Sequence, residues 1–175
     1  MALLAEYSVA ARPDRSIIEV HDADAYLGDQ AALSAAEVQV VAGNGYHLYL
    51  LSLQADIKVR VTIRVWDTPP KPPADAEGHV PVSIESETGI LVVNQLTFGP
   101  AGEMTLPLPG VYEGYAWWAG RAAASVYYDE VLSRIDEDWT PELIRQAWDR
   151  CPADERYVLD LGFVREPEPD DEDDE

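Results

Sequence analysis

The chain has 175 residues, of which 33 are acidic and 12 are basic, so its formal net charge is −21. Eight of the acids lie between Glu166 and Glu175, which leaves 25 acids against the 12 basic residues in the rest of the chain. Such a surplus of negative charge repels nucleic acid and anionic membranes, and it favours a basic protein as the partner.

Cysteine content and hydropathy indicate a cytoplasmic location. Cys151 is the only cysteine, so no intrachain disulfide can form. No apolar run approaches the length of a membrane-spanning helix, and residues 1–6 lack the basic region of a signal peptide. The preference for Arg over Lys, together with abundant Ala, is typical of a GC-rich bacterial genome.

Alternation of apolar and polar residues predicts short strands through the first two-thirds of the chain. In chain order they cover residues 3–10, 16–21, 37–42, 46–53, 57–66, 79–85, 90–93, 103–108 and 111–119. Residues 22–36 are expected to form a loop with a possible helical turn. Gly43-Asn44-Gly45 is typical of a hairpin turn, because Asn and Gly both tolerate positive φ. The strand at 103–108 is interrupted by prolines and is expected at a sheet edge.

The stretch 46–66 is expected to organise the fold as two long strands joined at residues 54–56. The first strand is apolar on both faces, which places it inside a sheet. In the second strand, one face carries the apolar residues Ile57, Val59, Val61, Ile63 and Val65, which we expect to face the core. The other face carries a basic stripe of Lys58, Arg60 and Arg64. This stripe would either pair with acids on neighbouring strands or receive an anionic segment such as the C-terminal tail.

Helical periodicity replaces alternation after residue 119. One helix face is formed by Ala124, Tyr128, Val131, Leu132 and Ile135, and the other helix carries Leu143, Ala147, Trp148 and Cys151. Thr140-Pro141 marks the start of the second helix. We expect both helices to pack on the sandwich, burying Tyr128, Leu132, Leu143 and Trp148. They would then cover one face of the aromatic strand at 111–119, and an exposed sugar-stacking platform is the alternative.

A last strand at 156–163 brings the count to about ten short strands, as expected for a two-sheet protein. The sequence therefore predicts a mainly β fold, an antiparallel two-sheet sandwich of the jelly-roll type with a two-helix insert before the last strand. We expect one domain over residues 1–165, with the insert at about 121–152. Residues 166–175 are expected to form a disordered acidic tail.

Two segments resemble a known group of proteins. Pro109-Gly110-Val111-Tyr112-Glu113-Gly114-Tyr115 and Glu155-Arg156-Tyr157-Val158-Leu159-Asp160-Leu161 are separated by the helical insert. Their Gly-Tyr pattern and strand spacing resemble the C-terminal half of small bacterial β-sandwich proteins, which include competence protein J-like nuclease inhibitors. The resemblance extends over about residues 37–163. It implies a sandwich fold and, for the inhibitor group, a nuclease partner.

No motif indicates an enzyme, a cofactor or a metal site. His21, His47 and His79 are far apart and lack metal-binding spacing, so we expect strand-edge or core positions for them. Cys151 is expected to be a small buried apolar residue. Residues 22–33 depart from the pattern of a calcium loop, and no nucleophile elbow or glycine-rich phosphate loop is present.

The expected function is that of a non-catalytic immunity or inhibitor-type protein that covers a basic partner such as a nuclease-like toxin. The candidate partner-binding residues are the tail acids Glu168, Asp170, Asp171, Glu172, Asp173, Asp174 and Glu175. The tail could equally serve solubility alone. Two other classes stay open: a carbohydrate-binding sandwich, and a structural or accessory subunit of a bacterial assembly.

Overall fold

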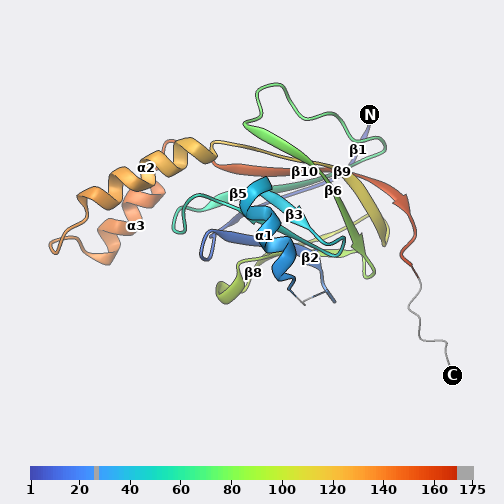
Figure 1. The fold of residues 1–175 in the computed structure, drawn as a ribbon, viewed down its shortest axis with the longest axis horizontal. Helices are drawn as coiled ribbons and strands as arrows, with labels where there is room; N and C mark the ends of the chain where they lie inside the picture. Colours follow the sequence, from blue (N-terminus) through green and yellow to red (C-terminus); the bar gives the residue numbers. More distant parts are fainter. Residues whose placement is uncertain (26–27, 169–175) are drawn as a thin grey trace.

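The computed structural model describes residues 1–25 and 28–168, in which ten strands form two packed five-stranded sheets (Figure 1). Sheet A has the order β1 (Leu3–Ala11), β5 (Val59–Trp66), β10 (Arg156–Arg165), β9 (Gly110–Ala119) and β6 (Gly78–Ser86). Sheet B has the order β3 (Val41–Gly43), β4 (His47–Leu51), β2 (Ile17–Asp22), β7 (Ile90–Asn94) and β8 (Pro100–Thr105). The predicted mainly β, two-sheet sandwich with a two-helix insert is confirmed.

Besides the strands, the described part of the chain contains three α-helices: α1 (Gln30–Gln39), α2 (Arg121–Arg134) and α3 (Pro141–Asp149). A short 3-10 turn, η1, covers Leu96–Phe98. Within the described residues, no helix combines the length and the apolar character needed to cross a membrane.

The core lies between the two sheets and is built from the alternating residues of both. The predicted inward residues of the 57–66 stretch are all buried: Ile57, Val59, Val61, Ile63 and Val65. Val59, Val61, Ile63 and Val65 belong to one apolar cluster with Ile18 and Val20 of β2 and Leu48 and Leu50 of β4. Full burial of each such side chain stabilises the fold by about 1.5–3 kcal/mol.

The two long strands of the 46–66 stretch lie in different sheets, and the chain crosses between sheets at residues 52–58. β5 pairs with β1 on one side and, in parallel, with β10 on the other. This parallel pair departs from the predicted antiparallel arrangement. Parallel neighbours need a long connection, and β5 and β10 are separated by four strands and both helices of the insert.

Only the end of the predicted strand at residues 37–42 forms, as β3 from Val41, because α1 continues to Gln39. Asp29 caps this helix, and its Oδ1 accepts hydrogen bonds from the backbone N–H groups of Ala31 and Ala32 at 2.9 and 3.1 Å. The alanine-rich segment favours the helix. It packs on the outer face of sheet B, where Ala32 and Ala36 contact Tyr49.

Each sheet edge lies against the other sheet. β1 contacts β8, and β6 contacts β3. Gly102 of β8 lies so close to Tyr7 that an added Cβ would come within 1.9 Å of the tyrosine hydroxyl. Because edge strands with free backbone groups pair with other chains, this closure protects all four edges.

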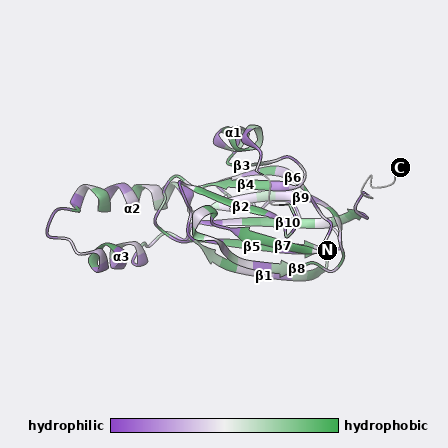
Figure 2. Cartoon of the chain, turned by 90° about the horizontal axis from the view of Figure 1, so that it is seen from below, coloured by the Kyte–Doolittle hydropathy of each residue, from purple (hydrophilic) through white to green (hydrophobic). Residues whose placement is uncertain are grey.

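The two helices of the insert form an arm, residues 121–151, that extends beyond one end of the sandwich (Figures 1 and 2). The prediction that they pack on the sandwich is wrong. α3 has no buried residue, and Leu132 and Leu143 remain 45% and 47% exposed. Instead the helices pack on each other, with the rings of Tyr128 and Trp148 stacked at 4.9 Å between centroids. The predicted cap is present, since Thr140 Oγ1 accepts from the N–H of Leu143 at 3.1 Å.

Candidate functional site

The far end of the arm combines acidic and apolar side chains. Asp136, Glu137 and Asp138 follow one another in the loop between α2 and α3, and all three are exposed. Leu132 and Leu143 lie in the turns of α2 and α3 next to this loop and are also exposed. We call these five residues the arm tip. Exposed apolar side chains with a polar surround are typical of protein-binding surfaces.

Polar contacts attach the arm to the end of the sandwich. Tyr128 donates from its hydroxyl to Asp56 Oδ2 at 2.8 Å, and Arg12 donates to Asp56 Oδ1 at 3.1 Å. Burial, together with the hydrogen bond to Asp56, raises the pKa of Tyr128 to about 12. The phenol therefore remains a neutral donor at physiological pH. Arg121, the first residue of α2, donates from Nε to the carbonyl of Leu51 at 2.9 Å.

A buried polar cluster lies where the chain returns from the arm to β10. Glu155 accepts hydrogen bonds from the Tyr157 hydroxyl at 2.6 Å and from Gln54 Nε2 at 3.2 Å. Burial raises the pKa of Glu155, although hydrogen bonds from Ser52, Tyr157 and Gln54 oppose the shift. Burial also raises the pKa of Tyr157. This cluster joins the crossing between sheets to the base of the arm.

A groove of about 470 Å³ runs between α3 and the sandwich. Its walls include the apolar side chains of Ile144 and Trp148 and the basic side chains of Arg12 and Lys58. The groove is large enough to accept a side chain of a protein that binds the arm.

The three residues of the basic stripe have different surroundings. Arg64 binds Asp160 of β10 with two hydrogen bonds, of 2.7 and 3.0 Å. Trp66 and Trp117 donate their indole N–H groups to the same carboxylate at 2.8 and 2.9 Å. Arg60 lies 3.5 Å from Asp154, and Lys58 lines the groove. Pairing with an acid on a neighbouring strand is thus confirmed for Arg64, whereas the acid near Arg60 lies in the loop before β10.

The aromatic strand is neither an exposed platform nor a surface for the insert. Trp117 and Trp118 point to opposite faces as predicted, and each is 7% exposed. Trp118 belongs to the core. Trp117 lies on the outer face of sheet A, where the guanidinium of Arg156 sits 5.6 Å from its ring centroid. The expectation that the helical insert covers this strand is wrong.

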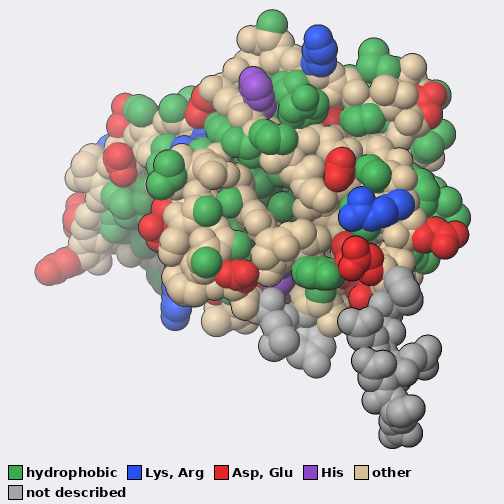
Figure 3. All heavy atoms as spheres, turned by 45° about the vertical axis from the view of Figure 1, so that its right-hand side comes forward, with side chains coloured by type: hydrophobic (Ala, Val, Ile, Leu, Met, Phe, Trp, Pro, Cys, Tyr) green, Lys and Arg blue, Asp and Glu red, His purple; other side chains and the backbone are tan. Residues whose placement is uncertain are grey.

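The tail acids can be placed only in part. Glu168 donates its backbone N–H to Glu85 Oε1 at 2.8 Å. It comes three residues after β10, and that strand ends on the side of the sandwich opposite the arm (Figure 1). The other candidates, Asp170 to Glu175, lie outside the described residues. Acidic side chains are scattered over the body as well, as Figure 3 shows for one face.

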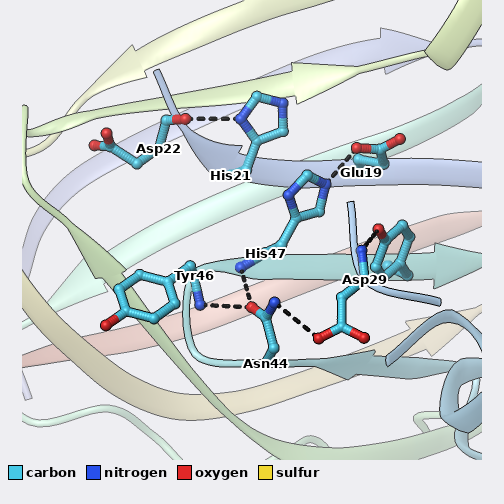
Figure 4. Close-up of polar contacts among 8 residues, drawn as sticks. Glu19, His21, Asp22, Asp29, Asn44, Tyr46 and His47 are labelled. Atoms are coloured by element: carbon cyan, nitrogen blue, oxygen red, sulfur yellow. Dashed lines mark hydrogen bonds and ion pairs between the residues drawn. The ribbon is translucent and has the colours of Figure 1, made fainter. Parts of the chain in front are cut away.

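Two of the three histidines come together in the structure. His21 and His47 are direct partners in the register of β2 and β4, next to Glu19 (Figure 4). Within the described residues, this is the group whose atoms could hold a metal ion. His79 lies apart on β6 of sheet A and is exposed. Cys151 is half-buried, and burial raises the pKa of its thiol.

Comparison with known proteins shows the fold. No family model matches the chain, and the search of curated proteins finds no match. Among solved structures, it is similar to ComJ from Bacillus subtilis, described as an inhibitor of the DNA-degrading activity of NucA. The TM-score is 0.59 at 11% identity, covering 93% of this chain and 98% of that one. A structure described as crocagin biosynthetic gene J matches with a TM-score of 0.49 at 17% identity, covering 97% of this chain and 100% of that one. The chain therefore has the fold of ComJ, in agreement with the resemblance noted in its sequence.

Proposed function

We propose that this protein is a non-catalytic inhibitor that binds a nuclease through the arm tip. The observation that carries the proposal is the arm itself, which leaves the sandwich and presents two exposed leucines beside three consecutive acids. The fold shared with the nuclease inhibitor ComJ supports the class of partner. We further propose a bacterial, cytoplasmic setting, which the single cysteine supports.

The chemistry of the arm tip suits a basic partner. A nuclease binds the phosphates of its substrate with positive charge, and carboxylates complement the same surface. Leu132 and Leu143 supply apolar area that a partner can remove from water, which the acids cannot do. The projection of the arm lets both kinds of side chain enter a concave site.

The tail has a separate part in this proposal. Its acids add negative charge to an acidic body and so increase the rate of encounter with a basic partner. Affinity would come from the arm tip, because a charged tail supplies little shape recognition. Loss of tail charge should therefore slow association at low salt and leave the dissociation rate nearly unchanged.

The test begins with the nuclease that co-purifies with this protein from its own cells at low salt. Its activity is then measured against increasing amounts of wild type and of three variants. Leu132→Asp with Leu143→Asp removes the apolar part of the arm tip. Replacement of residues 136–138 by lysine reverses its charge. The matched control replaces residues 171–173 by lysine, which makes the same change of charge in the tail.

Both arm variants should lose inhibition by roughly 100-fold or more, since they replace two and three interface residues worth about 1–2 kcal/mol each. The tail control should retain inhibition at high salt. Equal inhibition by wild type and both arm variants would show that another surface binds the nuclease. If the co-purifying nuclease is not inhibited at all, the proposed function itself is wrong.

A further inference from the structure

A buried cluster of two histidines and one glutamate lies on the outer face of sheet B (Figure 4). Glu19 and His21 are two residues apart on β2 and so leave the same face of the sheet. His47 lies directly opposite His21 on β4. One nitrogen of each imidazole and one carboxylate oxygen all lie within 4.8 Å of one another.

The cluster is shielded from solvent. Glu19, His21 and His47 are 8%, 7% and 1% exposed. The ring of His47 stacks between those of His21 and Tyr49, with centroid distances of 4.6 and 5.0 Å. Tyr49 in turn packs under α1. The small residual exposure lies on the side of Glu19 and His21.

Hydrogen bonds leave nitrogen atoms available in both rings. His21 Nδ1 lies 2.7 Å from the backbone carbonyl oxygen of Asp22, and a carbonyl can only accept. The proton therefore sits on Nδ1, and Nε2 of His21 keeps its lone pair. A backbone carbonyl in this position is the usual device that orients a metal-binding histidine.

His47 is not fully satisfied by the residues around it. Its Nε2 contacts Glu19 Oε2, whereas its Nδ1 is buried without a hydrogen-bond partner in the described residues. Buried polar atoms are nearly always paired, so an orphaned ring nitrogen beside a carboxylate and a second imidazole points to an additional ligand.

We propose that Glu19, His21 and His47 bind a transition-metal dication of the Zn²⁺ class. Two imidazoles and one carboxylate form the ligand set of three-residue zinc sites and of related iron sites. Nitrogen ligands disfavour Ca²⁺ and Mg²⁺, which prefer oxygen. Ligands about 2.0–2.2 Å from one ion lie at most about 4.4 Å apart, so small side-chain rotations close the site. An ion here would join β2 to β4, away from the arm and independent of the proposed inhibition.

The experiment uses the full chain after treatment with a chelator and dialysis. Zn²⁺ is titrated in an excess of Mg²⁺, which occupies the weak oxygen sites of the acidic surface. One Zn²⁺ should bind per chain. At about 100 times the dissociation constant, it should raise the melting temperature by roughly 5–10 °C. Co²⁺ should give the visible absorption of a four- or five-coordinate site with nitrogen ligands.

Glu19→Gln, His21→Gln and His47→Gln should each weaken Zn²⁺ binding strongly. The loss should exceed the roughly 10–100-fold that is typical when a residue hydrogen-bonded to a metal ligand is replaced. The matched control is His79→Gln, which removes an exposed histidine from the other sheet. The Co²⁺ spectrum of the wild type tests the site even if a variant fails to fold. Lack of both one-to-one Zn²⁺ binding and the spectrum would overturn the proposal. Equal Zn²⁺ affinity of the His47→Gln and His79→Gln variants would also overturn the proposal, because the metal would then be bound by the acidic surface.

Discussion

Replacing Asp160 with asparagine should destabilise the protein by about 3–4 kcal/mol, because this buried carboxylate accepts four N–H donors. Two come from Arg64, and one each from Trp66 and Trp117. Asparagine offers one acceptor oxygen and one NH₂ group. In either orientation of the asparagine amide, two of the four N–H donors point at its NH₂ group. Arg64 also loses the negative charge that it pairs with.

The magnitude follows from the burial of the partners. The Asp160 side chain is 1% exposed, whereas Arg64 keeps 27% exposure. Breaking a fully buried pair costs about 3–5 kcal/mol, and the partial solvation of Arg64 favours the lower part of this range. A matched change is Asp154→Asn, where Asp154 lies 3.5 Å from Arg60 and the two side chains are 51% and 55% exposed. Such a surface pair contributes at most about 1 kcal/mol.

The assay is equilibrium unfolding in urea, followed by tryptophan fluorescence and by circular dichroism. At an unchanged m-value, the midpoint of the Asp160 variant should fall well below that of the Asp154 variant. The melting temperature of the Asp160 variant should drop by roughly 10 °C. Free energies of unfolding within about 1 kcal/mol of each other would show that the Asp160 network does not stabilise sheet A.

Three further changes test other parts of the structure. Val61→Asp should abolish cooperative thermal unfolding, because it buries an unpaired carboxylate at a fully buried position; a normal melting curve would contradict the register of β5. The pKa of Glu155 is higher in the folded protein than its value near 4.5 in the unfolded chain. The contribution of this group to stability is therefore complete below pH 4.5 and is lost as the pH rises through the pKa of the folded protein. Glu155→Gln should therefore gain melting temperature relative to wild type as the pH rises above about 4.5, and a difference independent of pH would refute this. Leu132→Asp and Leu143→Asp should each lower the free energy of unfolding by about 1–2 kcal/mol, since both side chains are only partly covered and Asp is a weaker helix former than Leu; a loss above about 3 kcal/mol in chemical denaturation would mean that the arm packs on the sandwich.

Local patterns were enough to identify most elements of the fold. The β-branched alternation from Ile57 to Val65 predicted both the strand and its buried face. Thr140 and Pro141 marked the start of α3, and Gly43 to Gly45 marked the hairpin between β3 and β4. In each case the pattern that predicts the element lies within a few neighbouring residues, so it can be recognised in a single sequence.

Long-range pairing could not be read in this way. The sequence does not specify that β10 inserts between β5 and β9, or that His21 lies opposite His47. The metal-binding candidate was missed for this reason, because it exists only in that register. The start of the predicted strand at residues 37–42 is wrong, because an apolar pattern this short does not separate a strand from the end of a helix.

The arm was misplaced for a different physical reason. An apolar stripe on a helix shows that one face must be covered, but not by what. In α2 and α3 the two stripes cover each other in part, through Tyr128 and Trp148, while Leu132 and Leu143 stay exposed. The three acids at 136–138 are evident in the sequence, but only the structure shows that they lie at the end of a projecting arm.

Amide hydrogen exchange of the protein, alone and bound to the proposed nuclease partner, tests the central claim most directly. Binding through the arm tip should slow exchange in the C-terminal part of α2, the acidic loop and the first turns of α3, over about residues 130–145. The outer faces of both sheets should exchange at the same rate in the two states. Protection confined to the sheets, with the arm unchanged in the complex, would contradict the arm tip as the inhibitory surface.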